Sequence, residues 1–336
     1  MDRLNITVVG AGVFGLWQAF EFARRGHQVT VREAMPEAES GGSSRFAGAM
    51  LAPFCEGEAA EPVVIQLGIE GQKLWQEAFS HVAQRGSLVV APARDLSELR
   101  RFERMTQAHK SVDGTAIGEL EPDLAGRFSR GLYFPTEGHL SPRHALKELI
   151  AGLRRLGAEL VFGEPVADPV WRAAPAGGVV IDCRGIAARN DLPQLRGVRG
   201  EMAVVRTRDV RLSRPVRLLH PRFPLYIVPW GPDLYMVGAT VIEREDFGPV
   251  TVRSALDLLG TAYAVHPGFG EAEIVEMSAG VRPAFPDNVP KVVVQGRRLF
   301  VNGAFRHGYL MAPALARIAA DFLETGARHP EVVVDG

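Results

Sequence analysis

The sequence predicts an α/β fold with two lobes, in which a domain built on a parallel sheet is interleaved with a β-rich α+β domain. Three observations support this prediction. A strand–helix–strand pattern occupies residues 4–33, a further buried strand over 179–183 leads to a glycine, and strand-rich segments fill 200–242. With 336 residues, the chain is also longer than a typical single domain.

The chain opens with a βαβ unit. Residues 4–9 and 28–33 are short apolar runs rich in β-branched residues, which is typical of buried strands. Between them, apolar residues at helical spacing predict a helix over 13–25, and Gly26 would end it. The glycine-rich turn between the first strand and this helix makes the unit Rossmann-like.

The remaining elements follow from similar patterns. Ser141 and Pro142 predict a helix start, because serine can accept amide hydrogen bonds at an N-cap and proline lacks the N–H that would stay unpaired there. Helices are expected over 63–82, 95–106, 141–156 and 251–264 and from about Pro313 to Thr325, and strands over 89–90, 131–134, 160–162, 201–206, 226–228, 234–241, 291–294 and 299–301. We expect one discontinuous domain of residues 1–60, 138–198 and 276–336, and a second of residues 61–137 and 199–275.

Composition excludes several classes of protein. Lys plus Arg (38) nearly balances Asp plus Glu (39), so no global field attracts nucleic acid or a membrane surface. No apolar run approaches the roughly 20 residues that span a bilayer, and no signal-peptide pattern precedes the first strand. Two cysteines, Cys55 and Cys183, do not form a disulfide framework. We therefore expect a cytoplasmic protein with free thiols.

One short stretch is unusually rich in arginine. We interpret it as a solvated surface of strands and loops, since charge runs usually face water. The alternative is a docking face for an acidic partner. The stretch contains Arg196, Arg199, Arg206, Arg208, Arg211, Arg214 and Arg217.

The first turn carries a dinucleotide-binding motif. Gly10 permits the tight turn after the strand, Gly12 lets the backbone approach a pyrophosphate, and Gly15 allows close packing of helix on strand. The phosphates would sit at the helix N-terminus, where free amides and the helix dipole favour anions. Glu33 ends the second strand, where a carboxylate would accept hydrogen bonds from ribose hydroxyls and repel a 2′-phosphate.

A second glycine-rich segment follows the βαβ unit. The backbone of Gly41 and Gly42 and the hydroxyls of Ser43 and Ser44 could contact a second phosphate and a ribitol, although a flexible polar loop would have the same composition. The small residues at 47–49 would let a flat ring lie against the backbone. If the two segments bind a ligand in this way, that ligand would be FAD rather than NAD.

An ordered set of segments resembles the FAD-dependent D-amino-acid oxidase family, and within it the glycine oxidases of bacterial thiamine biosynthesis. The resemblance covers nearly the whole chain, and the order of the segments is more specific than any one of them. The segments are Gly10–Gly15, Phe46–Pro53, Val198–Glu201, Tyr226–Pro229, Val237–Thr240, Ala279–Pro283 and Phe305–Pro313.

The resemblance implies a Rossmann-like FAD-binding domain of the glutathione-reductase/D-amino-acid-oxidase type and non-covalent FAD at the lobe boundary. Amides at the start of the last helix would stabilise negative charge on the reduced flavin. By position, Val166 would hold the adenine through its backbone. The full set of expected FAD-binding residues is Gly10, Gly12, Val13, Phe14, Gly15, Glu33, Ala34, Ser43, Ser44, Ala47, Gly48, Ala49, Met50, Val166, Gly185, His307, Gly308, Tyr309 and Leu310.

Three residues are expected at the substrate. Arg282 would bind the α-carboxylate through two hydrogen bonds from its planar guanidinium. Tyr226 would donate a further hydrogen bond to that carboxylate, and Arg306 would lie beside substrate and flavin. No side chain is required as a general base if a hydride passes directly from the substrate carbon to flavin N5. No metal-binding motif is expected.

By resemblance, the expected reaction oxidises glycine to an imine and reduces oxygen to hydrogen peroxide. The imine then hydrolyses to glyoxylate and ammonia. Sarcosine or D-alanine are alternative substrates, a dehydrogenase with another acceptor is an alternative activity, and a non-catalytic assembly module is an alternative class. Expected partners are glycine, oxygen, the thiazole synthase and a second copy of the chain. Three residues depart from the family pattern, namely Ala49, Trp230 and Ala304.

Overall fold

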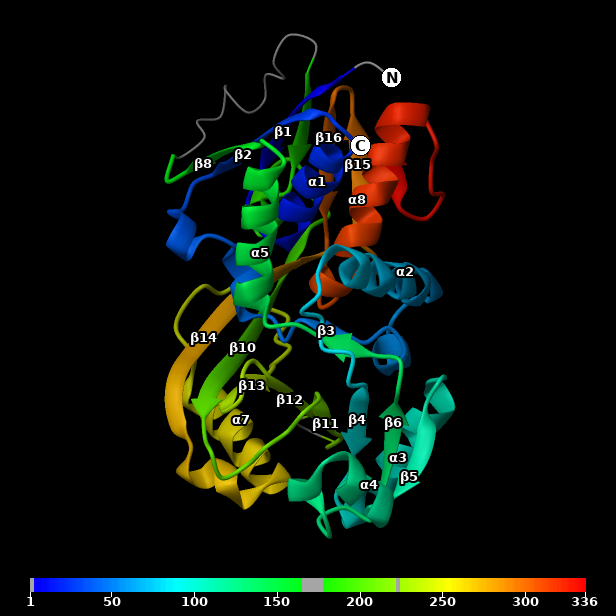
Figure 1. Ribbon diagram of the computed structural model, residues 1–336, viewed down its shortest axis with the longest axis vertical. Coiled ribbons are helices and arrows are strands. Elements are labelled where there is room, and N and C mark those ends of the chain that lie inside the picture. The colour runs from blue at the N-terminus through cyan, green and yellow to red at the C-terminus, as the bar shows by residue number, and fades with distance from the viewer. Residues whose placement is uncertain (1–2, 165–177, 222–223) are drawn as a thin grey trace.

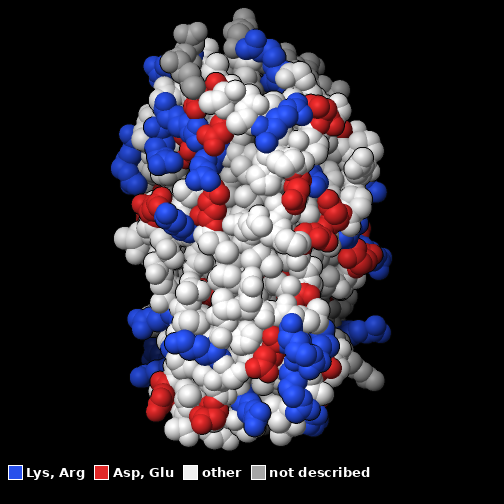
Figure 2. Space-filling model, turned by 90° about the vertical axis from the view of Figure 1, so that its right-hand side faces the viewer, with Lys and Arg blue, Asp and Glu red and all other residues white. Residues whose placement is uncertain are grey.

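The computed structural model describes residues 3–164, 178–221 and 224–336, and these residues form an elongated molecule with two lobes (Figure 1). Each lobe is built on one large sheet. Both termini lie at the end of the lobe that holds β1, β2 and β16. On the face shown in Figure 2, charged side chains gather towards the two ends and are sparse across the middle.

The first lobe holds a seven-stranded sheet that is mostly parallel. Its core strand β1 pairs in parallel with β2 on one side and with β9 on the other, so segments far apart in the sequence become neighbours. Among the described strands of this sheet, only β15 and β16 pair antiparallel. The strand order is β17 (Val333–Asp335), β15 (Lys291–Gln295), β16 (Arg298–Asn302), β9 (Val179–Asp182), β1 (Asn5–Val9), β2 (Gln28–Glu33) and β8 (Glu159–Phe162).

Helices cover this sheet and bury its apolar residues. Among them, α1 (Val13–Arg24) packs against both α5 (Pro142–Arg155) and α8 (Gly308–Thr325), and α8 packs against α2 (Pro62–Ala78). The apolar side chains of these helices and of the central strands form one continuous core. This core holds the N-terminal ends of α1 and α8 in place, and removing its apolar surface from water is the main stabilising term.

The second lobe holds an eight-stranded sheet that is mostly antiparallel. One of its faces packs on α7 (Val252–Val265) through a second apolar core. The strand order is β14 (Glu273–Ala284), β10 (Arg196–Arg206), β13 (Leu234–Gly238), β12 (Leu225–Pro229), β11 (Val216–Leu218), β4 (Ser87–Val90), β6 (Arg130–Phe134) and β5 (Lys110–Asp113). Helices α3 (Leu96–Met105) and α4 (Gly114–Leu120) belong to the same lobe (Figure 1).

Short elements lie at the waist between the lobes. A two-stranded sheet joins β3 (Met50–Leu51) to β7 (Gly138–His139). Single 3-10 turns precede and follow β3, namely η2 (Gly42–Phe46) and η3 (Cys55–Glu58). The fold class is therefore the predicted one. The predicted domain boundaries stay a prediction.

The last helix begins earlier than predicted. Helix α8 starts at Gly308, and Pro313 lies inside it. Proline cannot donate to the carbonyl four residues before it, so the Tyr309 oxygen is left without a helical partner. The indole Nε1–H of Trp75 in α2 donates to that oxygen at 2.7 Å. A side chain from another helix thus allows the proline to be accommodated.

The arginine-rich stretch is only partly a solvated surface, and the prediction was wrong for three of its members. Arg199 is buried against Glu201 at 2.7 Å, and Arg214 is buried against Glu121 at 2.7 Å. Arg217 is buried as well. By contrast, the side chain of Arg208 is 88% exposed. Alternating strand residues point to opposite faces, so a run of like charges does not stay on one surface.

Two expected absences can be compared with the described part of the chain. Within residues 3–164, 178–221 and 224–336, none of the helices has the length and apolar composition that a membrane span requires. Among the same residues, no group of three or more histidine, cysteine, aspartate or glutamate side chains is arranged to hold a metal ion. Both cysteines are buried and free.

Candidate active site

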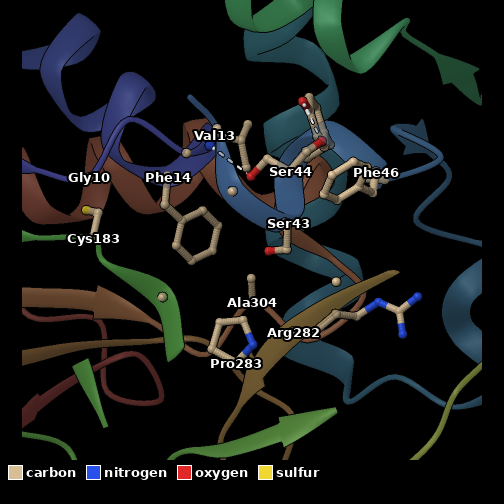
Figure 3. Close-up of a pocket in the computed structure, with 18 of the residues that line it drawn as sticks. Gly10, Val13, Phe14, Ser43, Ser44, Phe46, Cys183, Arg282, Pro283 and Ala304 are labelled. Carbon is tan, nitrogen blue, oxygen red and sulfur yellow. Dashed lines mark hydrogen bonds between the residues drawn. The ribbon is translucent and has the colours of Figure 1, made fainter. Parts of the chain in front are cut away.

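A pocket at the waist brings the predicted motifs together. It is lined by the turn after β1, the η2 turn, the segment leading into β3, the sheet face of the second lobe and the start of α8. In the close-up, Gly10 and Val13 lie at one end, and the guanidinium of Arg282 lies at the other and points away from them (Figure 3). The pocket is therefore elongated, with a main-chain end and a charged end.

The three glycines of the first turn are glycine for different structural reasons. Gly10 has a φ of +99°, and a Cβ there would lie 2.7 Å from the Cys183 carbonyl oxygen. A Cβ on Gly15 would collide with the Gly10 carbonyl oxygen. A Cβ on Gly12 would meet nothing closer than the Ser44 hydroxyl at 3.4 Å. The protein itself thus requires glycine at 10 and 15, and the space beside Gly12 is left for a ligand.

Side chains of two neighbouring segments brace this turn. The Ala11 amide donates to Glu33 Oε2 at 2.7 Å, and the Met35 amide donates to Glu33 Oε1 at 3.0 Å. Each carboxylate oxygen keeps a second lone pair, so Glu33 can still accept a hydrogen bond from a ligand hydroxyl. The Val13 amide donates to the Ser44 hydroxyl at 3.1 Å (Figure 3).

The N-termini of two long helices face the pocket. Val13 and Phe14 of α1 line it, and so do the first residues of α8, Gly308 to Leu310. The Tyr309 hydroxyl donates to the Pro142 carbonyl at 3.1 Å, which fixes α8 against α5. Free amides and the positive end of each helix dipole make this end of the pocket favourable for anions.

Arg282 lies at the charged end of the pocket. Its Nη1 donates to the Thr240 carbonyl at 3.1 Å, and no described carboxylate lies within ion-pair distance of it. The guanidinium crosses Gly200 on the neighbouring strand, where a Cβ would collide with it. Burial lowers the pKa of Arg282, and the nearby charge of Arg306 lowers it further. A half-buried cation with so few partners is suited to an anionic ligand.

The register of the sheet places Tyr226 on the same face as Arg282. Tyr226 pairs with Gly238, Met202 pairs with the same glycine, and Gly200 pairs with Gly280. Because paired residues and residues two apart on a strand share a face, these positions and Arg282 all belong to one side of the sheet. A Cβ on Gly48 would lie 2.8 Å from the Tyr226 ring, so the ring packs directly on that backbone.

A carboxylate that the sequence analysis missed completes this end of the pocket. Glu56 in η3 lines it, with Oε1 3.6 Å from Arg306 Nη2 and Oε2 3.9 Å from His307 Nδ1. Burial alone would raise the pKa of Glu56, but the surrounding cations, Arg306 foremost, lower it below its usual value. Burial also lowers the pKa of His307 to about 4, so its imidazole is neutral at neutral pH. Glu56 is thus an anion beside Arg306.

Most of the predicted site residues line this one pocket. Gly15 does not, because it packs beneath the turn, and Val166 lies outside the described residues. Sequence reasoning missed Glu56, Phe46 and Asn302 as lining residues. The side-chain Nδ2 of Asn302 donates to the Gly185 carbonyl at 2.9 Å. This contact spans 117 residues of sequence, so no local motif could reveal it. The roles of all these residues stay predictions.

The three departures from the family pattern have separate surroundings. Ala49 is buried with a φ of +50°, a left-handed conformation in which glycine is favoured. Trp230 lies under the guanidinium of Arg143, whose carbon is 5.4 Å from the ring centre. Ala304 forms an isolated bridge with Ala284. Of the three departures, only Ala49 has a backbone conformation that explains why glycine is common at its position.

The fold and the pocket define a dinucleotide-binding protein. An anion-binding turn with space beside Gly12, a carboxylate at the end of β2, two helix N-termini and a long pocket fit FAD. The family model described as "DAO: FAD dependent oxidoreductase" matches residues 5–322. The chain therefore belongs to this family, and its cofactor is FAD.

Three relatives share most of this chain. The provisionally named thiamine biosynthesis oxidoreductase ThiO of Rhizobium etli is 51% identical over 98% of this chain and 99% of its own. The glycine oxidase of Geobacillus kaustophilus is 27% identical over 96% of this chain and 93% of its own. The bifunctional protein ThiO/ThiG of Trichormus variabilis is 26% identical, over 95% of this chain and 52% of its own.

A solved structure has the same fold. The crystal structure of glycine oxidase from Geobacillus kaustophilus superposes with a TM-score of 0.79 at 23% identity, with 96% of this chain and 95% of that chain covered. The two-lobed architecture is therefore shared over nearly the whole length.

Proposed function

We propose that this protein oxidises glycine with oxygen, giving the imine and hydrogen peroxide, and that it does so in the biosynthesis of the thiamine thiazole. The observation that carries the proposal is the presence of opposite charges at one end of the pocket. Arg282 has no described carboxylate partner, and the Glu56 carboxylate accepts no hydrogen bond from the described residues. A small zwitterion supplies a carboxylate for the first and an ammonium for the second.

The names of the relatives support the same substrate. The Geobacillus kaustophilus relative is a glycine oxidase, and the Rhizobium etli relative carries a name from thiamine biosynthesis. The latter is 51% identical over nearly the whole of both chains. The fusion in Trichormus variabilis is named for ThiO and ThiG together, which supports an association of this chain with the thiazole synthase.

Each residue has a defined task in this proposal. Arg282 binds the substrate carboxylate through its planar guanidinium, and the Tyr226 hydroxyl donates a further hydrogen bond to it. These two contacts orient the α-carbon within the pocket. Glu56 attracts the ammonium group and orients it within the pocket. Arg306 sets the charge around Glu56.

The cofactor would be held by the main-chain end of the pocket. Gly12, Val13 and the amides of η2 would contact its phosphates, Glu33 its ribose, and the start of α8 its ring. When bound, FAD supplies the acceptor for the electron pair of the substrate C–H bond and is reoxidised by oxygen to give hydrogen peroxide. No described side chain is needed to remove a proton from the carbon.

Anaerobic mixing with glycine tests this proposal. We expect glycine to bleach the visible absorbance of the bound flavin, and air to restore it with formation of hydrogen peroxide. Bleaching by sarcosine or D-alanine but not by glycine would show that the substrate is one of those amines and not glycine. Bleaching that air does not reverse would indicate a dehydrogenase with another acceptor. A flavin that none of the three amines reduces would contradict an amine-oxidising function.

A further inference from the structure

The η3 turn is a short segment that supplies one charged residue to the pocket. Its four residues, Cys55 to Glu58, belong to no sheet and to no longer helix, yet Glu56 lines the pocket. A single 3-10 turn is weak by itself because it closes few hydrogen bonds. Other groups must hold the turn if the Glu56 carboxylate is to stay beside Arg306.

Glu137 holds the N-terminal side of this turn. Its Oε1 accepts hydrogen bonds from the Phe54 amide at 3.1 Å and from the Cys55 amide at 2.7 Å, across more than 80 residues of sequence. Glu137 is fully buried and directly precedes β7, which pairs with β3. Its Oε2 has no hydrogen-bond partner among the described residues, although the Ser87 hydroxyl is close enough to affect its pKa. The backbone bonds of Glu137 therefore go to the turn that carries Glu56.

Arg217 holds the other side of the turn. Its Nη1 donates to the Cys55 carbonyl at 3.0 Å, and its Nη2 pairs with Glu58 at 2.9 Å. The guanidinium also lies over the Phe102 ring, 4.8 Å from its centre, and is buried. Glu137 lies just before β7 and Arg217 lies in β11, so two separate segments hold one turn.

We propose that Glu137, together with Arg217, is a positioning residue that holds the η3 turn so that Glu56 forms a wall of the substrate end of the pocket. The proposal deepens the proposed function and rests on it. Glu137 does not line the pocket, and it acts through two backbone amides. Its loss should therefore change how substrate binds and leave FAD binding intact.

Two substitutions separate the loss of the hydrogen bonds from the loss of the carboxyl group. Glu137→Ala removes both bonds and should raise the KM for glycine about tenfold with a smaller change in kcat, a coupling of ordinary size for residues in contact. Glu137→Gln keeps an oxygen at the same place and should restore the wild-type KM. Should Glu137→Ala fail to fold, Glu137→Asp, which is shorter by one methylene, provides the same test.

A double-mutant cycle shows whether Glu137 acts through Glu56. We expect Glu137→Ala to have little further effect on kcat/KM once Glu56→Gln is present, because the positioned group is already gone. Additive effects would overturn the proposal. Glu121→Ala is the control. Glu121 is similarly buried and also accepts a backbone hydrogen bond, but from Ser213, far along the chain from the turn, and it pairs in addition with Arg214. Its effects should add to those of Glu56→Gln.

Hydrogen exchange tests, without any substrate, whether Glu137 holds the η3 turn through its two amide hydrogen bonds (the clamp). In the FAD-bound protein, the amides of Phe54 and Cys55 should exchange at least roughly tenfold faster in Glu137→Ala than in the wild type, and Glu121→Ala should leave them unchanged. Unchanged exchange in Glu137→Ala would overturn the clamp. If glycine proves not to be a substrate, this measurement still decides the positioning, so the two proposals fail separately.

Discussion

The two ends of the pocket are lined by different kinds of group. At the end proposed for the cofactor, the lining groups belong mainly to the main chain, with glycines at 10 and 12 and the first amides of α1 and α8. At the end proposed for the substrate, they are the charged side chains of Arg282, Arg306 and Glu56. Main-chain contacts suit a ligand that is the same throughout a family, and side-chain contacts suit one that differs between its members.

The difference also concerns how each end is supported. The glycine turn joins a strand to the helix that follows it and is braced by Glu33 and Ser44 from segments close by in the sequence. The three charged residues instead come from β14, from the segment before α8 and from η3. Their mutual arrangement depends on the packing of both lobes. The predictions below test whether ligand binding at the first end depends on free space beside the main chain, and at the second end on charged side chains. They are given in order of decreasing effect.

The largest effects should follow a matched pair of glycine substitutions. Gly15→Ala forces a Cβ onto the Gly10 carbonyl, so we expect severe destabilisation or no folded protein. Gly12→Ala finds ordinary contacts in the protein and should fold, but should bind FAD about 100-fold more weakly because its methyl occupies the phosphate space. Circular dichroism and flavin titration measure the two. A Gly12→Ala protein with wild-type FAD affinity would contradict the assignment of the space beside Gly12 to the cofactor phosphates.

Arg282→Leu should be the most damaging substitution at the charged end. We expect kcat/KM for glycine to fall roughly 1,000-fold, since truncating one partner of a desolvated charge pair costs several kcal/mol. FAD should remain bound, because Arg282 lies at the opposite end of the pocket from Gly10. Arg208→Leu, at a side chain that is 88% exposed, should leave the kinetics unchanged. Equal kinetics for both variants would remove Arg282 from substrate binding.

Glu137 should make stability depend on pH. Burial raises its pKa from 4.5 to about 8, and Glu56 adds to the rise, while the Cys55 amide, the Ser87 hydroxyl and the Phe54 amide oppose it. The folded protein then binds a proton that the unfolded chain has lost, so this contribution to the free energy of unfolding falls as the pH rises from about 4.5 to about 8. Glu137→Gln should flatten this part of the curve. Urea unfolding at several pH values across this range measures it, and parallel curves would contradict the raised pKa.

The smallest effect concerns Ala49, which lines the pocket. Its φ of +50° costs a non-glycine residue about 1 kcal/mol. Ala49→Gly should therefore raise the free energy of unfolding by up to about 1 kcal/mol, which chemical denaturation can resolve. Ala145 provides the control, because it is buried in the regular helix α5, where Ala145→Gly should destabilise the protein. Destabilisation by both substitutions would show that the backbone at Ala49 carries no strain.

The sequence was sufficient for the main-chain end because its signals are local. The spacing of Gly10, Gly12 and Gly15 after a strand, with Glu33 at the end of the next one, predicts the turn without any knowledge of the rest. The structure confirmed the fold class, and the family match confirmed the cofactor. The resemblance supplied Arg282 and Tyr226, which the sheet register then placed on one face.

The charged end could not be completed in the same way. The strand β14, which carries Arg282, was not predicted as a strand, and Glu56 lies in a polar segment that resembles an ordinary loop. The cation nearest to Glu56 is Arg306, close to the other end of the chain, so no periodicity or spacing connects them. The start of α8 was misplaced for a related reason, since Pro313 is tolerated only because a distant tryptophan satisfies the carbonyl that it leaves free.

The pairing of the first strand has a consequence for the synthesis of the protein. Strand β1 needs β9 beside it, and β9 in turn needs β16, whose residues 298–302 come near the end of the chain. On the ribosome, the glycine turn emerges on the order of tens of seconds before the segments that enclose it. We therefore expect a nascent chain to retain FAD only after translation has passed α8, and a chain stalled before that point to be exposed to chaperones and proteases.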